Sequence, residues 1–114
     1  MEQTAFQVTT CDGQELSCAR AGSGQVVMLV HGLGFRKKHW VHQVTALVNA
    51  GFTAVSFDLR GFGGSPLPDH AYDMAQLARD LEAVREHVGV ECFHLVGHSL
   101  GGMVAVEYAL TQPD

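Results

Sequence analysis

Ser99 has the surroundings that most favour chemistry in this sequence, because it stands in the segment Gly97-His98-Ser99-Leu100-Gly101-Gly102. A serine hydroxyl becomes a nucleophile when a base accepts its proton. It is exposed when it sits on a sharp turn from a strand into a helix, a geometry called a nucleophile elbow. Apolar runs precede and follow Ser99, as this turn requires. We expect Gly97 and Gly101 because side chains there would collide where strand and helix approach each other, and Gly102 extends that approach.

The same glycines could instead belong to a phosphate-binding loop at the start of a helix. A phosphate loop would carry a lysine after its glycines, whereas Met103 and Val104 follow here. The sequence therefore favours a nucleophile at this turn over a phosphate site.

The strands that must position Ser99 can be predicted from apolar patterning. Two loosely alternating segments flank an Asp-Gly turn signal at residues 11–13, which predicts an antiparallel hairpin. Apolar runs without alternation predict strands that are covered on both faces. The predicted strands are residues 5–10, 14–20, 26–30, 53–57 and 93–96.

Helices are predicted between these strands. One places Trp40, Val44, Leu47 and Val48 on a single face and ends at Gly51. The next follows a capping pair of Asp73 and Gln76 and ends at Gly89, with its apolar face formed by Met74, Leu77, Ala78, Leu81, Val84 and Val88. The helix after Ser99 is apolar almost all round, with Glu107 as the exception, which predicts a buried central helix. Alternating strands and helices predict an α/β fold with a parallel sheet.

Three motifs in this order resemble the α/β-hydrolase family, and in particular its serine hydrolase and esterase members. They are the elbow around Ser99, the loop His31-Gly32-Leu33-Gly34 after the strand at 26–30, and Asp58-x-Arg60-Gly61-x-Gly63-x-Ser65 after the strand at 53–57. The resemblance implies the N-terminal part of that fold. It implies a mostly parallel sheet of strand order 1-2-4-3-5, with an antiparallel opening hairpin and helices on both faces.

The resemblance also implies roles around Ser99. Ser99 is the expected nucleophile, and the backbone N–H groups of Leu100 and Leu33 are the expected donors to the oxyanion. The loop of His31, Gly32 and Gly34 taken alone could equally be a glycine-rich connection without a catalytic role. We expect His31 to order that loop through a hydrogen bond.

Two further residues, Phe35 and His98, are candidates for substrate contact. Packing is the alternative role for both, and it is the favoured one for Phe35. Of the third motif we expect a structural role, in which Asp58 and Arg60 pair with each other and hold the loop against the sheet. Gly61 and Gly63 permit tight turns there, and Ser65 closes the motif.

The acid and the histidine that complete a catalytic triad in this family follow the serine in the chain. No histidine follows His98, and Asp114 is the only carboxylate after Glu107. We therefore expect residues 1–114 to be a partial α/β-hydrolase domain that is inactive alone, with the remainder of the same chain as its partner. Residues 93–96 would then form an unpaired apolar sheet edge.

Composition restricts the partners. Seven basic residues face twelve acidic ones, for a formal net charge of −5, and no basic run exceeds Arg36-Lys37-Lys38. We expect neither nucleic acid nor an anionic membrane surface as a partner. No apolar run approaches the about 18 residues of a membrane span, and residues 1–4 do not begin a signal peptide. The sequence predicts a cytoplasmic protein with a small-molecule substrate.

The sequence suggests no metal and no cofactor. Its three cysteines, Cys11, Cys18 and Cys92, are odd in number and form no CxxC pair, so we expect packing residues. His39 and His42 are three apart in a predicted helix, but no third ligand accompanies them, and we expect both to face solvent.

The favoured function is hydrolysis of an ester-type substrate, a carboxylic ester or lactone, or of a related carbonyl compound, through an acyl-enzyme on Ser99. Dehalogenases and epoxide hydrolases are disfavoured because they resemble the family but carry an aspartate at the place of Ser99. The alternative is a noncatalytic binding or scaffold module that keeps the fold, which the missing acid and base would fit. Against it, such a module has no need of a strained serine between glycines.

Overall fold

The structure is a computed structural model that describes residues 3–112. Five strands form one sheet in the order β1-β2-β4-β3-β5. They are β1 Thr4–Thr9, β2 Glu15–Gly22, β3 Val26–Val30, β4 Thr53–Phe57 and β5 His94–Gly97. The helices are a 3-10 turn η1 Lys37–Trp40, α1 Val41–Asn49, α2 Met74–Val88 and α3 Leu100–Thr111. The predicted strand order is confirmed.

The opening hairpin and the parallel strands are also as predicted. β1 pairs with β2 and β2 with β4 in antiparallel fashion, whereas β3 pairs with both β4 and β5 in parallel. All strands except β2 therefore run in the same direction. β3 is the interior strand of this parallel part, and its carboxyl end meets the loop at His31 and the elbow after β5.

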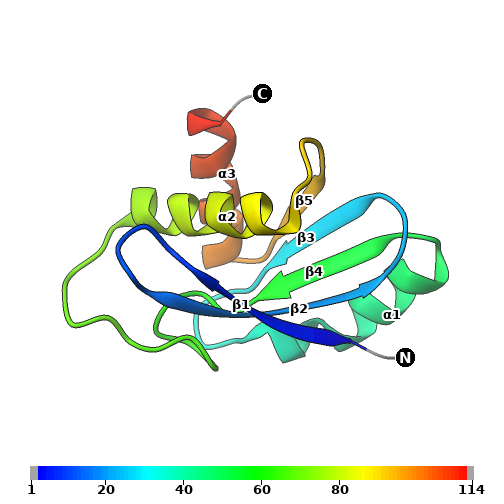
Figure 1. Cartoon of the computed structure of the whole chain (residues 1–114), viewed down its shortest axis with the longest axis horizontal. Helices are drawn as coiled ribbons and strands as arrows, with labels where there is room; N and C mark the ends of the chain where they lie inside the picture. Colours follow the sequence, from blue (N-terminus) through cyan, green and yellow to red (C-terminus); the bar gives the residue numbers. More distant parts are fainter. Residues whose placement is uncertain (1–2, 113–114) are drawn as a thin grey trace.

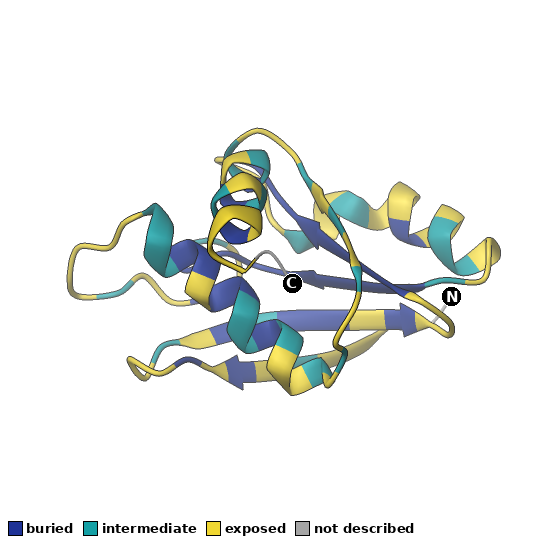
Figure 2. Cartoon of the chain, turned by 90° about the horizontal axis from the view of Figure 1, so that it is seen from above, coloured by how far each residue is buried: buried dark blue, intermediate teal, exposed yellow. Residues whose placement is uncertain are grey.

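β3 is apolar at every position and contributes side chains to the cores on both faces of the sheet. Val26, Met28 and Val30 contribute to one core cluster, while Val27 and Leu29 contribute to a second cluster. Figure 1 shows α2 and α3 on one side of the sheet and α1 on the other. β3 and β4 are buried at every position, and dark blue marks such buried stretches of strand in Figure 2.

The helix boundaries follow the predicted signals. Asp73 accepts a hydrogen bond of 2.9 Å from the Gln76 N–H and caps α2, and Gly89 ends the helix in the left-handed region at φ 81°. The second half of the expected capping pair is absent among the described residues, because the Gln76 side chain donates instead to Asp80 Oδ1 at 3.0 Å. On α1, Val44 is buried, with Trp40, Leu47 and Val48 packed against the same cluster.

The helix α3 departs from the prediction of a helix buried on all sides. Gly101, Val104 and Tyr108 are buried, whereas Met103, Val106 and Leu110 are 60%, 62% and 75% exposed. Within residues 3–112, α3 packs mainly against α2, β3 and β5, and these elements leave part of its surface uncovered. An apolar sequence shows that a helix can be buried all round, but the neighbours decide whether it is.

The strand β5 lies at the edge of the sheet, since it pairs with β3 alone among the described strands. Val96 on this strand is 42% exposed. The predicted apolar edge is therefore present. None of the described helices has the length and apolar character needed to cross a bilayer.

Candidate active site

Ser99 occupies a strained turn between β5 and α3. Its φ of 57° and ψ of −115° make it the only residue other than glycine with positive φ in the described part of the chain. A backbone conformation of this kind costs about 1–3 kcal/mol and persists only where the surrounding structure enforces it. Ser99 is exposed, so a ligand can approach it at the carboxyl end of β5.

Two glycines enforce the turn by allowing close backbone contact. A Cβ atom on Gly97 would lie 2.3 Å from the carbonyl oxygen of Gly101, and one on Gly101 would lie 2.0 Å from that of Val30. Neither position has room for a side chain, as the sequence predicted. Gly102 takes part in this approach through its backbone, because its nitrogen would lie 2.6 Å from a Cβ on Gly97. The position itself has room for a side chain, since a Cβ on Gly102 would meet nothing closer than 3.6 Å, an ordinary contact distance.

The loop after β3 approaches the elbow through Gly32. A Cβ on Gly32 would lie 3.1 Å from the Cβ of Ser99 and 2.9 Å from Nδ1 of His98. The next residues form a turn in which the Phe35 N–H donates to the Gly32 carbonyl at 3.0 Å, with Gly34 at φ 80°. The N–H groups of Leu33 and Leu100 donate no hydrogen bond within residues 3–112, so both are available as donors.

His31 is buried beneath this loop and uses both ring nitrogens. Its Nε2 accepts a hydrogen bond of 2.9 Å from the Leu59 N–H, so the proton resides on Nδ1, which donates to the Gly32 carbonyl at 2.8 Å. Burial disfavours the charged ring and lowers the pKa of His31. A neutral, doubly bonded imidazole orders the loop, and neither nitrogen is left to accept a proton from Ser99.

Beside the elbow lies an open pocket of about 250 Å³. Phe35 and His98 meet there edge to face, with ring centroids 5.5 Å apart, so the two residues singled out for substrate contact share one pocket. His39 also packs edge to face against Phe35, with ring centroids 5.1 Å apart. The remaining lining residues are His31, Gly32, Trp40 and Gln43.

The sequence did not single out Trp40 or Gln43 as site residues. The sequence predicts Trp40 on the core face of a helix, and its indole Nε1 is buried without a hydrogen-bond partner in the described structure. Only the folding of η1 and the start of α1 against the loop at Gly32 brings these side chains to the pocket. No spacing in the sequence signals that contact.

Ser99 itself borders a second, more open pocket of about 460 Å³. Its walls are mostly apolar and come from α2 and α3, namely Met74, Gly102, Met103, Val106 and Glu107. Met74 was predicted only as part of the buried face of α2. The adjacent residues His98 and Ser99 thus line different pockets, His98 the aromatic one and Ser99 the methionine-lined one.

Asp58 does not pair with Arg60, contrary to the prediction. It accepts hydrogen bonds from the Lys37 backbone N–H at 2.7 Å, the Lys37 ammonium at 2.9 Å and the Gly64 N–H at 2.9 Å. Gly63 must be a glycine because a Cβ there would lie 2.5 Å from the Asp58 carboxylate. Ser65 donates from Oγ to the Asp58 carbonyl at 2.6 Å.

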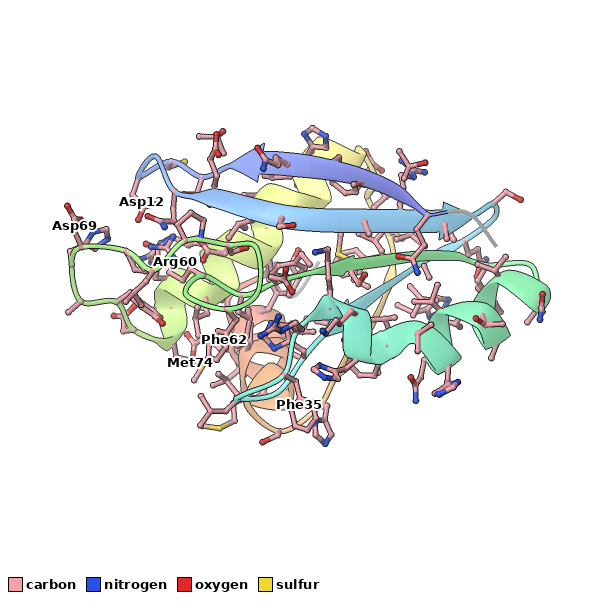
Figure 3. All side chains as sticks on the ribbon, turned by 90° about the horizontal axis from the view of Figure 1, so that it is seen from below. Asp12, Phe35, Arg60, Phe62, Asp69 and Met74 are labelled. Carbon is pink, nitrogen blue, oxygen red and sulfur yellow. The ribbon has the colours of Figure 1, made fainter. Side chains whose placement is uncertain are left out.

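Arg60 instead joins the hairpin turn to α2. Its guanidinium donates to both carboxylate oxygens of Asp80 at 2.7 Å and to those of Asp12 at 2.8 and 3.1 Å. Figure 3 shows Asp12 and Arg60 side by side at this end of the molecule. These ion pairs raise the pKa of Arg60 above its usual range, against the cost of burial. Gly61, with φ 85°, makes the turn that follows.

The two other expectations for polar residues have mixed outcomes. Cys18 is buried in the core, but Cys11 and Cys92 are exposed, so the prediction of packing residues holds for Cys18 only. His39 and His42 are exposed, as expected. Among residues 3–112, no three His, Cys, Asp or Glu side chains are grouped as metal ligands.

The site therefore combines a strained, exposed serine with two free backbone donors. Within the described residues the Ser99 hydroxyl has no hydrogen-bond partner, and no base is aimed at it. This arrangement can present a nucleophile and hold developing negative charge on an oxygen, which are two of the three requirements of acyl transfer.

Known proteins that are similar to this chain include several hydrolases. Epoxide hydrolase 3 of Siraitia grosvenorii is 33% identical over the whole chain, which spans 37% of that relative. The putative carbamate hydrolase RutD of Variovorax paradoxus (strain S110) is 40% identical over 79% of the chain and 34% of the relative. The chain thus spans about a third of the length of these curated relatives.

Solved structures of known enzymes are also similar to this chain. An esterase from Exiguobacterium antarcticum, EaEST, superposes with a TM-score of 0.91 over 96% of the chain and 41% of its own, at 28% identity. The model of the alpha/beta hydrolase fold family matches residues 25–114, which include β3 and the elbow. The sheet order and the sequence match agree, and the chain belongs to the α/β-hydrolase family.

Proposed function

We propose that Ser99 is the nucleophile of a serine hydrolase that acts on carboxylic esters, lactones or related carbonyl substrates. The observation that carries the proposal is the backbone of Ser99, the one non-glycine residue with positive φ among those described. Strain of this kind is typical of functional sites. The hydrolases among the relatives support hydrolysis in general. The serine at the elbow supports the narrower proposal of an acyl-enzyme formed from a carbonyl substrate.

In the proposed reaction, the Ser99 oxygen attacks the substrate carbonyl carbon and its proton passes to a base. The oxyanion that forms accepts hydrogen bonds from the Leu33 and Leu100 N–H groups. The alcohol then leaves with that proton, and water releases the acid from the acyl-enzyme. The aromatic pocket at Phe35 and His98 would receive an apolar group of the substrate.

The chemistry of the nucleophile favours esters over epoxides. An aspartate that opens an epoxide forms an ester, which water can hydrolyse, whereas a serine would form an ether, which it cannot. A serine at the elbow therefore cannot complete the turnover of an epoxide by that route. A carbonyl substrate gives an ester with serine, and the cycle closes.

We infer that the base comes from outside residues 3–112, in a domain of which residues 1–114 form the first part. Both nitrogens of His31 are engaged in backbone hydrogen bonds, and no described histidine bonds to Ser99. The length of the relatives supports this inference, since the chain spans only 37% and 34% of them. Residues 1–114 alone would then be inactive.

The test is covalent labelling of the full-length protein with a fluorophosphonate, which reacts with activated serines. Stoichiometric labelling is expected for the wild type and none for Ser99→Ala. Ser23→Ala, at an exposed serine between β2 and β3, is the matched control and should label normally. No labelling of the folded wild type would favour a noncatalytic scaffold, and labelling that survives Ser99→Ala would identify another nucleophile.

A further inference from the structure

Lys37 contacts Asp58 through two separate groups. Its backbone N–H donates to Oδ1 at 2.7 Å and its ammonium donates to Oδ2 at 2.9 Å. The Asp58 side chain is only 2% exposed. Burial opposes its ionisation, but hydrogen bonds from Lys37 and Gly64 outweigh burial and hold the pKa of Asp58 below its usual range. Asp58 is therefore a buried anion at neutral pH, with Lys37 as its counter-charge.

This pair fixes one end of residues 31–37, the segment that we call loop 31–37. The other end, at His31, is fixed by Leu59, the residue that follows Asp58. The Leu59 N–H donates to His31 Nε2 at 2.9 Å. Two consecutive residues after β4 thus hold both ends of a loop that begins after β3. Leu33 lies between the two attachment points.

The attachment at Lys37 reaches β2 as well. The Lys37 ammonium donates to Ser17 Oγ at 3.0 Å, and the Ser17 carbonyl accepts from the Asp58 N–H at 2.9 Å. Ser17 N–H in turn donates to Ser65 Oγ at 2.9 Å. The end of loop 31–37 is therefore anchored to two neighbouring strands of the sheet, which are rigid supports for a site.

Charge neutralisation alone would account for the ammonium of Lys37 but not for its backbone bond. A surface lysine could compensate Asp58 from any direction. Here the same residue also directs its main chain at the carboxylate, so the position of Asp58 fixes the path of loop 31–37. Because Gly32 contacts the elbow, this path sets where the Leu33 N–H lies relative to Ser99.

We propose that Lys37 is a positioning residue which, with Asp58, fixes loop 31–37 so that the Leu33 N–H points at the oxyanion formed on Ser99. This inference rests on the proposed function. A displaced oxyanion donor weakens binding of the transition state and leaves binding of the ground state almost unchanged. Lys37 would therefore act on kcat through Leu33 without touching the substrate.

The test compares Lys37→Met with Lys38→Met in the full-length protein on a p-nitrophenyl ester. Lys38 is the adjacent residue, is exposed, and makes no hydrogen bond or ion pair within residues 3–112. Lys37→Met should lower kcat about tenfold to hundredfold with KM changed by less than about twofold. Lys38→Met should leave both constants unchanged, and Lys37→Arg should recover most of the lost kcat.

Active sites are counted by fluorophosphonate titration, so that unfolded protein does not enter kcat. Asp58→Asn should lower kcat to a similar extent, and the double variant with Lys37→Met should be no worse than the poorer single variant. Equal kcat values for Lys37→Met and Lys38→Met would overturn the inference. So would a loss that appears only as fewer titratable sites, which would make Lys37 a folding residue. If Ser99→Ala keeps its activity, the proposed function fails instead.

Discussion

The Cα of Gly101 lies so close to the carbonyl of Val30 that a Cβ atom there would come within 2.0 Å of the carbonyl oxygen. Val30 is the last residue of β3 and Gly101 is the second residue of α3. This contact therefore joins the interior strand to the helix that follows Ser99. The Gly97 contact with the Gly101 carbonyl adds a second approach from β5. The elbow is therefore held by backbone packing from two strands.

Gly101→Ala should destabilise the fold by about 3 kcal/mol or more, because overpacking at a backbone contact forces the strand and helix apart. Gly102→Ala is the matched control, since a Cβ there meets nothing closer than 3.6 Å. It should change stability by no more than about 1 kcal/mol, toward greater stability, because alanine favours the helix. Urea unfolding measures both, and equal effects would contradict the packing argument.

Asp12 should make stability depend on pH in the acid range. The hydrogen bonds from Arg60, followed by the one from Thr10, hold the pKa of Asp12 below its usual range. A carboxyl with a depressed folded pKa stabilises the fold fully above its unfolded pKa of about 3.9, and this contribution is lost as pH falls through the folded pKa. Stability should therefore decline below about pH 5.

The measurement is the urea midpoint of wild type and Asp12→Asn at intervals from pH 7 to pH 3. The difference between the two proteins should be largest at pH 7 and should shrink as the pH falls. Glu15→Gln, an exposed carboxylate on the same hairpin, should keep the wild-type slope. A constant difference across this pH range would contradict the role assigned to the Arg60 hydrogen bonds.

Cys18 should be inert to alkylation in the folded protein. It is fully buried, and burial raises the pKa of its thiol to about 12, so the reactive thiolate is scarcely populated at pH 8. Cys11 lies exposed in the turn of the same hairpin. Iodoacetamide followed by peptide mass spectrometry should show Cys11 modified at least about a hundredfold faster than Cys18. The two rates should converge in urea, and rapid native labelling of Cys18 would contradict its placement.

The fold could be predicted because its signals are local. Glycines mark the turn at Gly13 and the helix ends at Gly51 and Gly89, and uninterrupted apolar runs mark strands buried on both faces. The elbow is equally local, since Gly97, Ser99 and Gly101 lie within five residues of one another. Strand order came from resemblance, because periodicity alone does not say which strands are neighbours.

The partners of buried charges could not be predicted in this way. Proximity in the sequence predicts a pair of Arg60 with Asp58, but the structure brings Asp80 from α2 and Asp12 from the hairpin to the guanidinium. Asp80 is buried on α2 beside apolar residues, and the helical pattern does not indicate that a charged side chain lies there. Lys37 shows the same difficulty, since nothing in a short basic run indicates that one lysine faces inward.

The position of β3 in the sheet has a consequence for synthesis. β3 ends at Val30, and its two partners, β4 and β5, begin at residues 53 and 94. A ribosome that adds about 5–20 residues per second takes roughly 3–13 s to pass from residue 30 to residue 94. For that time one edge of an entirely apolar strand has no partner, and the turn that holds Ser99 cannot close. A nascent chain stalled in this interval would offer β3 to chaperones or to other nascent chains.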